Sequence, residues 1–264
     1  MKKVTKITVV LLFLCALVIP AQAQRRAVRY LSNYENEPYH FGFLLAYNQM
    51  CYTIKTVEDY QNILQPNNSL PDAPTNNGIY VYSVETLQTP GFSVGIIGSK
   101  RLGRYFDLRF IPTLSFSDRQ MNYKLYLTGA TNPDKVLNKK IFTTFVEFPL
   151  NIKYRSKRYN NIGAYLMCGI NPKLDLASQK QNKETNAQGE EFINNLVTKR
   201  FDCAAEIGVG FDIYNQWFKM GVEIKMSYGF LDIVKKNPND MTLIYTTPID
   251  KLHNKMFQLS LLFE

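Results

Sequence analysis

The sequence predicts an all-β protein, an antiparallel up-and-down transmembrane β-barrel of about eight strands with short periplasmic turns and long extracellular loops. Three observations support this prediction. Apolar and polar side chains alternate through most of the chain, as in β-strands, whose successive side chains point to opposite faces. The connections between alternating segments are long and short in turn. The apolar side of each segment is long enough for a tilted strand to cross a membrane.

The first predicted element is a secretory signal peptide at residues 1–23. Three lysines precede the apolar run VVLLFLCALVI, and AQA at 21–23 is a small-x-small cleavage site. Cys15 does not indicate a lipoprotein, because Leu14 stands before it where lipid attachment needs a small residue. The mature chain is therefore expected to lie outside the cytoplasm.

The rest of the chain divides into a periplasmic N-terminal segment, residues 24–38, and the outer-membrane barrel, residues 39–264. Without the signal peptide, 31 basic side chains become 28 against 22 acidic ones, so the formal net charge falls from +9 to +6. This mild excess does not support nucleic-acid binding in an exported protein. No later segment has the run of about 18 apolar residues that a spanning helix needs.

Eight segments show the alternation and are the predicted strands. They are residues 40–48, 91–99, 106–116, 142–154, 161–176, 200–215, 217–230 and 257–264. In the third, FDLRFIPTLSF, Phe106, Phe110 and Phe116 lie on one side, and Asp107 and Arg109 lie on the other. The apolar side faces inward in a soluble barrel and faces lipid in a membrane barrel. Dense Phe, Leu and Ile on one side, and both charges mixed with glycine on the other, favour the membrane barrel.

The connections alternate in length through the whole chain. The tight turns are 99–103, 155–160 and 214–217, and the long polar loops are 50–78, 128–140, 178–199 and 232–253. Because a meander places successive connections at opposite ends, one end carries the tight turns and the other the long loops, as in bacterial outer-membrane barrels. Aromatic residues near the tight turns are typical of an interfacial girdle: Tyr39, Tyr105, Tyr154, Tyr159 and Trp217.

Charged residues on the polar side of the strands are predicted to face the barrel interior. They are Asp107, Arg109, Glu147, Lys153, Asp202, Glu206, Asp212, Lys219, Glu223 and Lys225. A barrel of about eight strands has room inside for side chains and little else, which disfavours a proton or ion path. Because unpaired buried charges are very costly, we expect these groups to pair in a structural network.

The chain offers few candidates for chemistry. His40 and His253 fall at opposite ends of the barrel, which argues against a two-histidine metal site, and no motif of a hydrolase triad surrounds either. We expect no catalytic residue, cofactor, metal or small-molecule substrate. Cys51, Cys168 and Cys203 are odd in number, which argues against a disulfide framework. Cys168 and Cys203 are interpreted either as small apolar residues or as a bridge between neighbouring strands.

Two tight turns carry clusters of basic residues. These are Lys100, Arg101 and Arg104 in one turn and Arg155, Lys157 and Arg158 in the other. One interpretation is that they are solvated turn residues. The other is a docking surface for an acidic periplasmic partner, since clustered charge steers association.

Three segments resemble the PorT family, outer-membrane barrels of the type IX secretion system. They are YHFGFLLAYN, PGFSVGIIGSKRLGRYFDLRFIPTLSFSDR and VEFPLNIKYRSKRYNNIGAYLMCGINPKLDLAS. The strand FDLRFIPTLSF and the strand-turn unit FPLNIKYRSKRYNN are the most specific parts. The chain departs from the usual barrel-assembly signal, which ends in an aromatic residue, because Glu264 follows Phe263.

The resemblance implies a non-enzymatic outer-membrane protein with periplasmic termini, needed for the export of cargo proteins. Its partners would be the lipid bilayer and other type IX secretion subunits of the outer membrane or periplasm. The resemblance brings no catalytic residues. The alternative is a stand-alone small barrel, either an adhesin that acts through its long loops or a membrane enzyme. Co-purification with secretion components would separate these functions.

Overall fold

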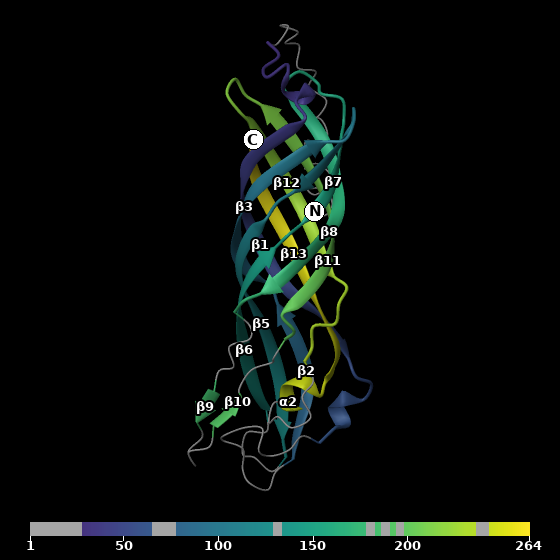
Figure 1. The fold of residues 1–264 in the computed structure, drawn as a ribbon. Helices are drawn as coiled ribbons and strands as arrows, with labels where there is room; N and C mark the ends of the chain where they lie inside the picture. The colour runs from purple at the N-terminus through teal and green to yellow at the C-terminus, as the bar shows by residue number, and fades with distance from the viewer. Residues whose placement is uncertain are drawn as a thin grey trace, which may run out of the picture.

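The alternating segments form long antiparallel strands that wind around one elongated barrel (Figure 1). The computed structural model describes residues 28–64, 78–128, 134–177, 183–185, 191–193, 198–235 and 243–264. The predicted signal peptide lies outside the described residues. None of the described helices is long and apolar enough to cross a membrane.

Eleven strands belong to the barrel sheet. They are β1 (Tyr39–Thr56), β2 (Ile79–Leu87), β3 (Thr89–Arg101), β4 (Phe106–Phe110), β5 (Thr113–Leu127), β6 (Asp134–Glu147), β7 (Leu150–Arg155), β8 (Ile162–Asp175), β11 (Phe201–Tyr214), β12 (Lys219–Gly229) and β13 (Ile249–Phe263). Strands β9 (Lys183–Thr185) and β10 (Glu191–Ile193) form a separate hairpin. The short helices are η1 (Tyr34–Asn36), η2 (Tyr60–Asn62) and α2 (Leu243–Thr246).

The eleven strands correspond to eight passes along the barrel wall, because three of these passes are each divided into two strands by a short break. Gln88 separates β2 from β3, and two-residue breaks that end in Pro112 and Pro149 separate β4 from β5 and β6 from β7. Proline has no N–H to donate to the ladder, so it interrupts a strand locally. Pairing of β8 with β11 and of β1 with β13 closes the sheet into the predicted antiparallel barrel.

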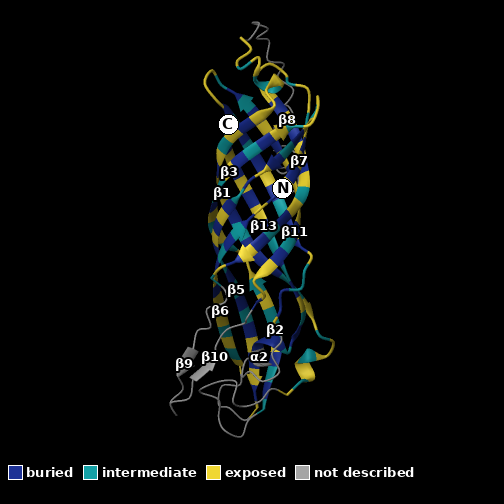
Figure 2. Cartoon of the chain, viewed as in Figure 1, coloured by how far each residue is buried: buried dark blue, intermediate teal, exposed yellow. Residues whose placement is uncertain are grey.

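Near the tight turns, exposed and buried residues alternate along the strands (Figure 2). The exposed ones are mostly apolar, as predicted, and the buried ones are mostly polar, apart from a small apolar cluster of Leu44, Ala46, Ile97, Ile111 and Leu262. Phe41 is 73% exposed on β1 and Ile207 is 65% exposed on β11. Their inward neighbours His40 and Glu206 are buried. We call this part of the wall the apolar band.

Beyond the apolar band, toward the long loops, the two faces exchange their chemistry. On β5 the outward residues change from Leu114 and Phe116 to Asp118 and Lys124. The inward residues of the same strand become apolar and are buried: Met121, Tyr123, Leu125 and Leu127. Residues from β1, β2, β6, β13 and α2 join them in one apolar cluster. Here the barrel packs like a soluble protein, with its apolar side chains inside.

This extension corrects three of the predicted loops. Strand β1 continues to Thr56, β6 begins at Asp134 and β13 begins at Ile249, so parts of the predicted loops 50–78, 128–140 and 232–253 are strand. The predictions were wrong there because only segments with an apolar outer face were assigned to strands. The predicted loop 178–199 lies mostly outside the described residues.

Candidate functional site: a basic pocket at the tight-turn end

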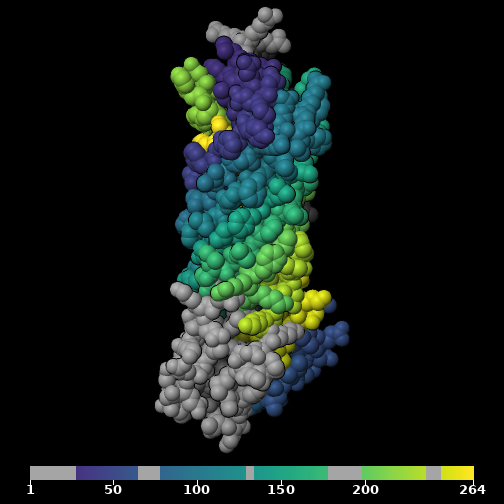
Figure 3. All heavy atoms as spheres, viewed as in Figure 1, coloured from purple at the N-terminus to yellow at the C-terminus, as the bar shows by residue number. Residues whose placement is uncertain are grey.

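The N-terminal segment, which the structure describes from Val28, folds against the tight-turn end of the barrel (Figure 3). The Asn161 side-chain amide donates to the carbonyl of Val28 at 2.9 Å, and its oxygen accepts from the N–H of Tyr30 at 3.1 Å. The Arg158 guanidinium donates to the carbonyls of Tyr30 and Leu31. Residues of the β7–β8 turn therefore hold this segment in place.

Tyr34 ties the same segment to the barrel mouth. Its hydroxyl donates to the Glu264 carboxylate at 2.9 Å, and its ring stacks on His40 with centroids 4.0 Å apart. Burial, together with the neighbouring Glu264 carboxylate, raises the pKa of Tyr34 well above its usual value. The hydroxyl therefore stays protonated and remains a donor. Glu264 faces inward because alternation places Phe263 outside, which explains the acidic residue after the last aromatic one.

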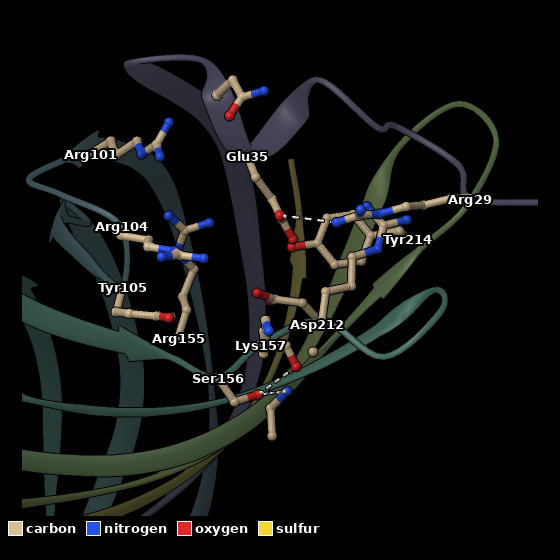
Figure 4. Close-up of a pocket in the computed structure, with 14 residues that line it drawn as sticks. Arg29, Glu35, Arg101, Arg104, Tyr105, Arg155, Ser156, Lys157, Asp212 and Tyr214 are labelled. Carbon is tan, nitrogen blue, oxygen red and sulfur yellow. Dashed lines mark hydrogen bonds and ion pairs between the residues drawn. The ribbon is translucent and has the colours of Figure 1, made fainter.

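A pocket of about 340 Å³ opens between the N-terminal segment and the tight turns (Figure 4). Six basic residues line it: Arg29, Arg101, Arg104, Arg155, Lys157 and Arg158. We call this site the basic pocket. Glu35 and Asp212 are its two acidic lining residues, so the lining carries four more positive than negative side chains.

Several of these charges are already paired. Arg155 contacts Asp107 at 2.7 Å, and Arg29 contacts Glu35 at 3.3 Å. Asp212 is paired with Lys153 inside the barrel at 2.6 Å. The lining carboxylates are therefore neutralised by partners of their own.

The remaining cations face the cavity with less restraint. Arg104 and Lys157 are exposed, and neither forms an ion pair with a carboxylate of the described residues. Arg101 is half-buried and donates from Nε to the carbonyl of Gly103 at 2.9 Å. The guanidinium of Arg158 lies 3.8 Å from the ring centroid of Tyr214, where it supports the pocket wall. The pocket thus presents positive charge that no carboxylate among the described residues balances.

Five of the six predicted docking residues line the basic pocket, and Lys100 does not. The ammonium group of Lys100 lies 5.7 Å from the ring centroid of Tyr39 instead. The sequence prediction missed Arg29, because the N-terminal segment has no alternation that shows where it folds. The basic clusters of the two turns can be found in the sequence. That they line one pocket cannot, because it depends on which strands pair in the sheet.

The predicted inward charges form the expected structural network. All ten are buried. Their pairs include Arg109–Glu223 at 3.0 Å, Lys153–Asp212 at 2.6 Å, Lys219–Glu264 at 2.5 Å and Lys225–Glu206 at 3.1 Å. Asp107 pairs with Arg155, Glu147 accepts from Asn171 at 2.6 Å, and Asp202 accepts from Asn254 at 2.7 Å.

Arg119 extends this network toward the long loops and was not predicted. Its guanidinium contacts Asp175 at 2.8 Å and Asn254 at 2.5 Å, and it lies 4.6 Å from the ring centroid of Tyr52. It was missed because the third predicted strand stopped at residue 116. With its partners, Arg119 separates the ionic interior from the apolar cluster.

The histidines and cysteines lie apart from one another. His40 is the second residue of β1, whereas His253 on β13 pairs with Thr53, near the other end of β1. No group of three or more His, Cys, Asp or Glu side chains among the described residues could hold a metal ion. Cys51, Cys168 and Cys203 are all free thiols, so the structure does not contain the Cys168–Cys203 bridge.

Comparison with solved structures finds small outer-membrane barrels. Ail of Yersinia pestis is 9% identical, with 86% of this chain and 98% of that chain covered and a TM-score of 0.32. Neisserial surface protein A is also 9% identical over 86% and 98%, with a TM-score of 0.38. OprG of Pseudomonas aeruginosa is 10% identical over 87% and 96%, with a TM-score of 0.36. No curated protein matches the chain.

Comparison with protein families gives a match over most of the chain. The family described as outer membrane protein beta-barrel domain matches residues 21–235. The closed antiparallel sheet, its apolar outer band and its polar interior agree with that match. The chain belongs to the outer membrane protein beta-barrel domain family.

Proposed function

We propose that this protein is a non-enzymatic component of the type IX secretion machinery, which serves cargo export through contacts with other secretion subunits. The basic pocket is the observation that carries the proposal. It gathers cations from two tight turns and the N-terminal segment at one end of the barrel. Clustered charge of one sign steers and orients an acidic partner. Both turns also belong to the segments that resemble the PorT family.

The filled interior supports a role through contacts. Paired ions and a small apolar cluster around Leu44 fill the lumen along the apolar band, and a larger apolar cluster fills it beyond. A barrel of about eight strands has no space for a protein chain to pass. In this proposal the tight turns and both termini face the periplasm, as in other bacterial outer-membrane barrels with short periplasmic turns. The basic pocket then meets periplasmic partners.

The test is a triple replacement of Arg101, Arg104 and Lys157 by serine. These residues are chosen because Arg155 and Arg158 also hold the barrel mouth together. The variant is expected to reach the outer membrane folded, shown by resistance to SDS in unboiled gels, and to lose cargo export. It should also fail to co-purify secretion subunits that the unaltered chain retains.

A matched control removes the same charge at the other end of the barrel, by replacement of the exposed residues Arg200, Lys235 and Lys251 with serine. This control should export cargo normally. Loss of export in the control alone would move the working surface to the long loops. Normal export in both variants and in a full deletion would refute the secretion role.

A further inference from the structure

The lipid-facing wall carries a groove directly beside the basic pocket. Tyr154, Leu166, Val209 and Phe211 line this groove of about 280 Å³, and Ala164 lies among them. Ala164 pairs with Phe211, and Tyr154 pairs with Leu166. The groove exists because the small side chain of Ala164 lies between the large side chains that cover the rest of this wall. We call it the wall groove.

The wall groove and the basic pocket share part of their lining. Ser156 and Ala164 line both. The Ser156 hydroxyl accepts from the N–H of Ala164 at 3.1 Å, which fixes this shared rim (Figure 4). One molecule can therefore contact both cavities across the rim, with a polar end in the pocket and an apolar end in the groove.

We propose that the basic pocket and the wall groove together bind one anionic glycerophospholipid. Its phosphate lies in the pocket with Arg104 and Lys157, and one acyl chain lies in the wall groove over Ala164. Basic pockets at the membrane surface recognise anionic headgroups in this way. An acidic segment of a protein partner, as in the proposed function, would use the charge of the pocket alone, whereas a lipid also fills the apolar groove on the lipid side. The two ligands would then compete for Arg104 and Lys157.

The two parts of the site contribute differently. An acyl chain that moves from the bilayer to the wall groove exchanges one apolar environment for another, so the hydrophobic effect contributes little. The charge of the headgroup therefore supplies the affinity, and the groove sets position. The site is expected to prefer phosphatidylglycerol to phosphatidylcholine, since their acyl chains can be identical and their net charges differ.

The first arm of the test measures the headgroup. Purified full-length chain in mixed micelles with equal phosphatidylglycerol and phosphatidylcholine is examined by native mass spectrometry for retained lipid. Replacement of Arg104 and Lys157 by serine should lower phosphatidylglycerol affinity about thirtyfold, from about 1 kcal/mol for each cation near the surface. Lys100→Ser is the control, because Lys100 is at the same end and does not line the pocket.

The second arm measures the groove and identifies the source of the phosphate. Ala164→Phe fills the wall groove and should lower phosphatidylglycerol retention severalfold, whereas Ala205→Phe, also exposed on the outer face of the barrel, should not. Soluble glycerol phosphate in excess should not displace the lipid. All variants are first shown to be folded by their resistance to SDS in unboiled gels.

Three outcomes would overturn the proposal. One is equal retention of the two phospholipids. Another is retention of phosphatidylglycerol that neither the cation variant nor Ala164→Phe changes. The third is displacement by glycerol phosphate without an effect of Ala164→Phe, which would show a site for free phosphate esters. These measurements use the purified chain, so they are independent of the secretion role, which is read from export in cells.

Discussion

Ile207 shows at the scale of one residue which medium surrounds the barrel. It lies near the middle of β11 and its side chain is 65% exposed on the apolar band. Replacement by arginine should cost about 2 to 4 kcal/mol of unfolding free energy at the bilayer midplane. Chemical denaturation in lipid vesicles would measure this cost.

Tyr126→Arg is the control for that measurement. Tyr126 also faces outward, at 46% exposure, but it lies beyond the apolar band beside polar residues of β5 and β6. The same arginine should change stability there by less than about 1 kcal/mol. Equal costs at the two positions would mean that both side chains meet the same medium, which would contradict the assigned band.

Gly210 tests the packing of the interior. A Cβ atom there would lie 2.4 Å from the Tyr165 ring and 2.7 Å from the Val222 carbonyl. The Tyr165 hydroxyl donates to Glu223, so the ring has little freedom to move. Gly210→Ala should therefore destabilise the barrel by about 1 to 3 kcal/mol. Gly163→Ala, also inward but with its nearest atom 3.9 Å away, should be tolerated, and denaturation of both variants checks this.

At this scale, the odd or even position of a residue along its strand predicts well whether its side chain faces the barrel interior. Asp107 and Arg109 could be assigned because each lies between large apolar neighbours on one strand. Their individual partners could not, since Arg109 contacts Glu223 and Glu264, which pairing of distant strands brings close. Alternation gives a direction for each side chain, whereas an ion pair needs the register of the whole sheet.

At the scale of the strand, β5 shows where prediction from alternation ends. The same parity stays inside from Thr113 to Leu127, but its chemistry changes from polar to apolar. Alternation alone does not reveal this change, because it shows that the two faces of a strand differ in polarity but not whether the outer face meets lipid or water. Asp118 and Lys140, which face outward and pair at 2.8 Å, are the sequence signal that marks the end of the band.

The N-terminal segment gives a prediction at the scale of an element. Asn161→Ala removes two hydrogen bonds to this segment, and Arg158→Ser removes those to Tyr30 and Leu31. Either change should speed amide hydrogen exchange at residues 28–36 at least severalfold while the barrel strands stay protected. Lys100→Ser should leave exchange unchanged. Unaltered exchange in both variants would show that other contacts hold the segment.

The position of this segment could not be predicted from sequence. Its contacts with Asn161 and Arg158 join residues far apart in the chain, and each depends on one polar side chain. No periodic pattern accompanies such contacts. Tyr34 does not indicate the position of the segment either, because a tyrosine before the first strand is as consistent with an interfacial girdle as with a buried cap.

For the whole molecule, the layers that fill the lumen along the barrel axis predict that the protein does not conduct ions. The N-terminal segment covers the tight-turn mouth, paired ions fill the lumen next to it, and the apolar cluster follows. We expect no stable single-channel steps in planar bilayers. Removal of residues 28–38 should not open a channel, since the inner layers remain. Reproducible steps from the unaltered chain would show that the lumen contains a continuous path.

The pairing of β1 with β13 also constrains how the barrel can be made. Phe43 lies opposite Phe263, so the seam joins nearly the first and the last residues of the barrel. Such a distant pairing carries the largest closure entropy in the sheet, and the seam is expected to form last. Until then both seam strands have free N–H and C=O groups, which cost several kcal/mol each in lipid. A barrel with an open seam is therefore not stable in the bilayer. Insertion and seam closure must occur together, or the open edges must pair with the edge of another protein until the seam closes.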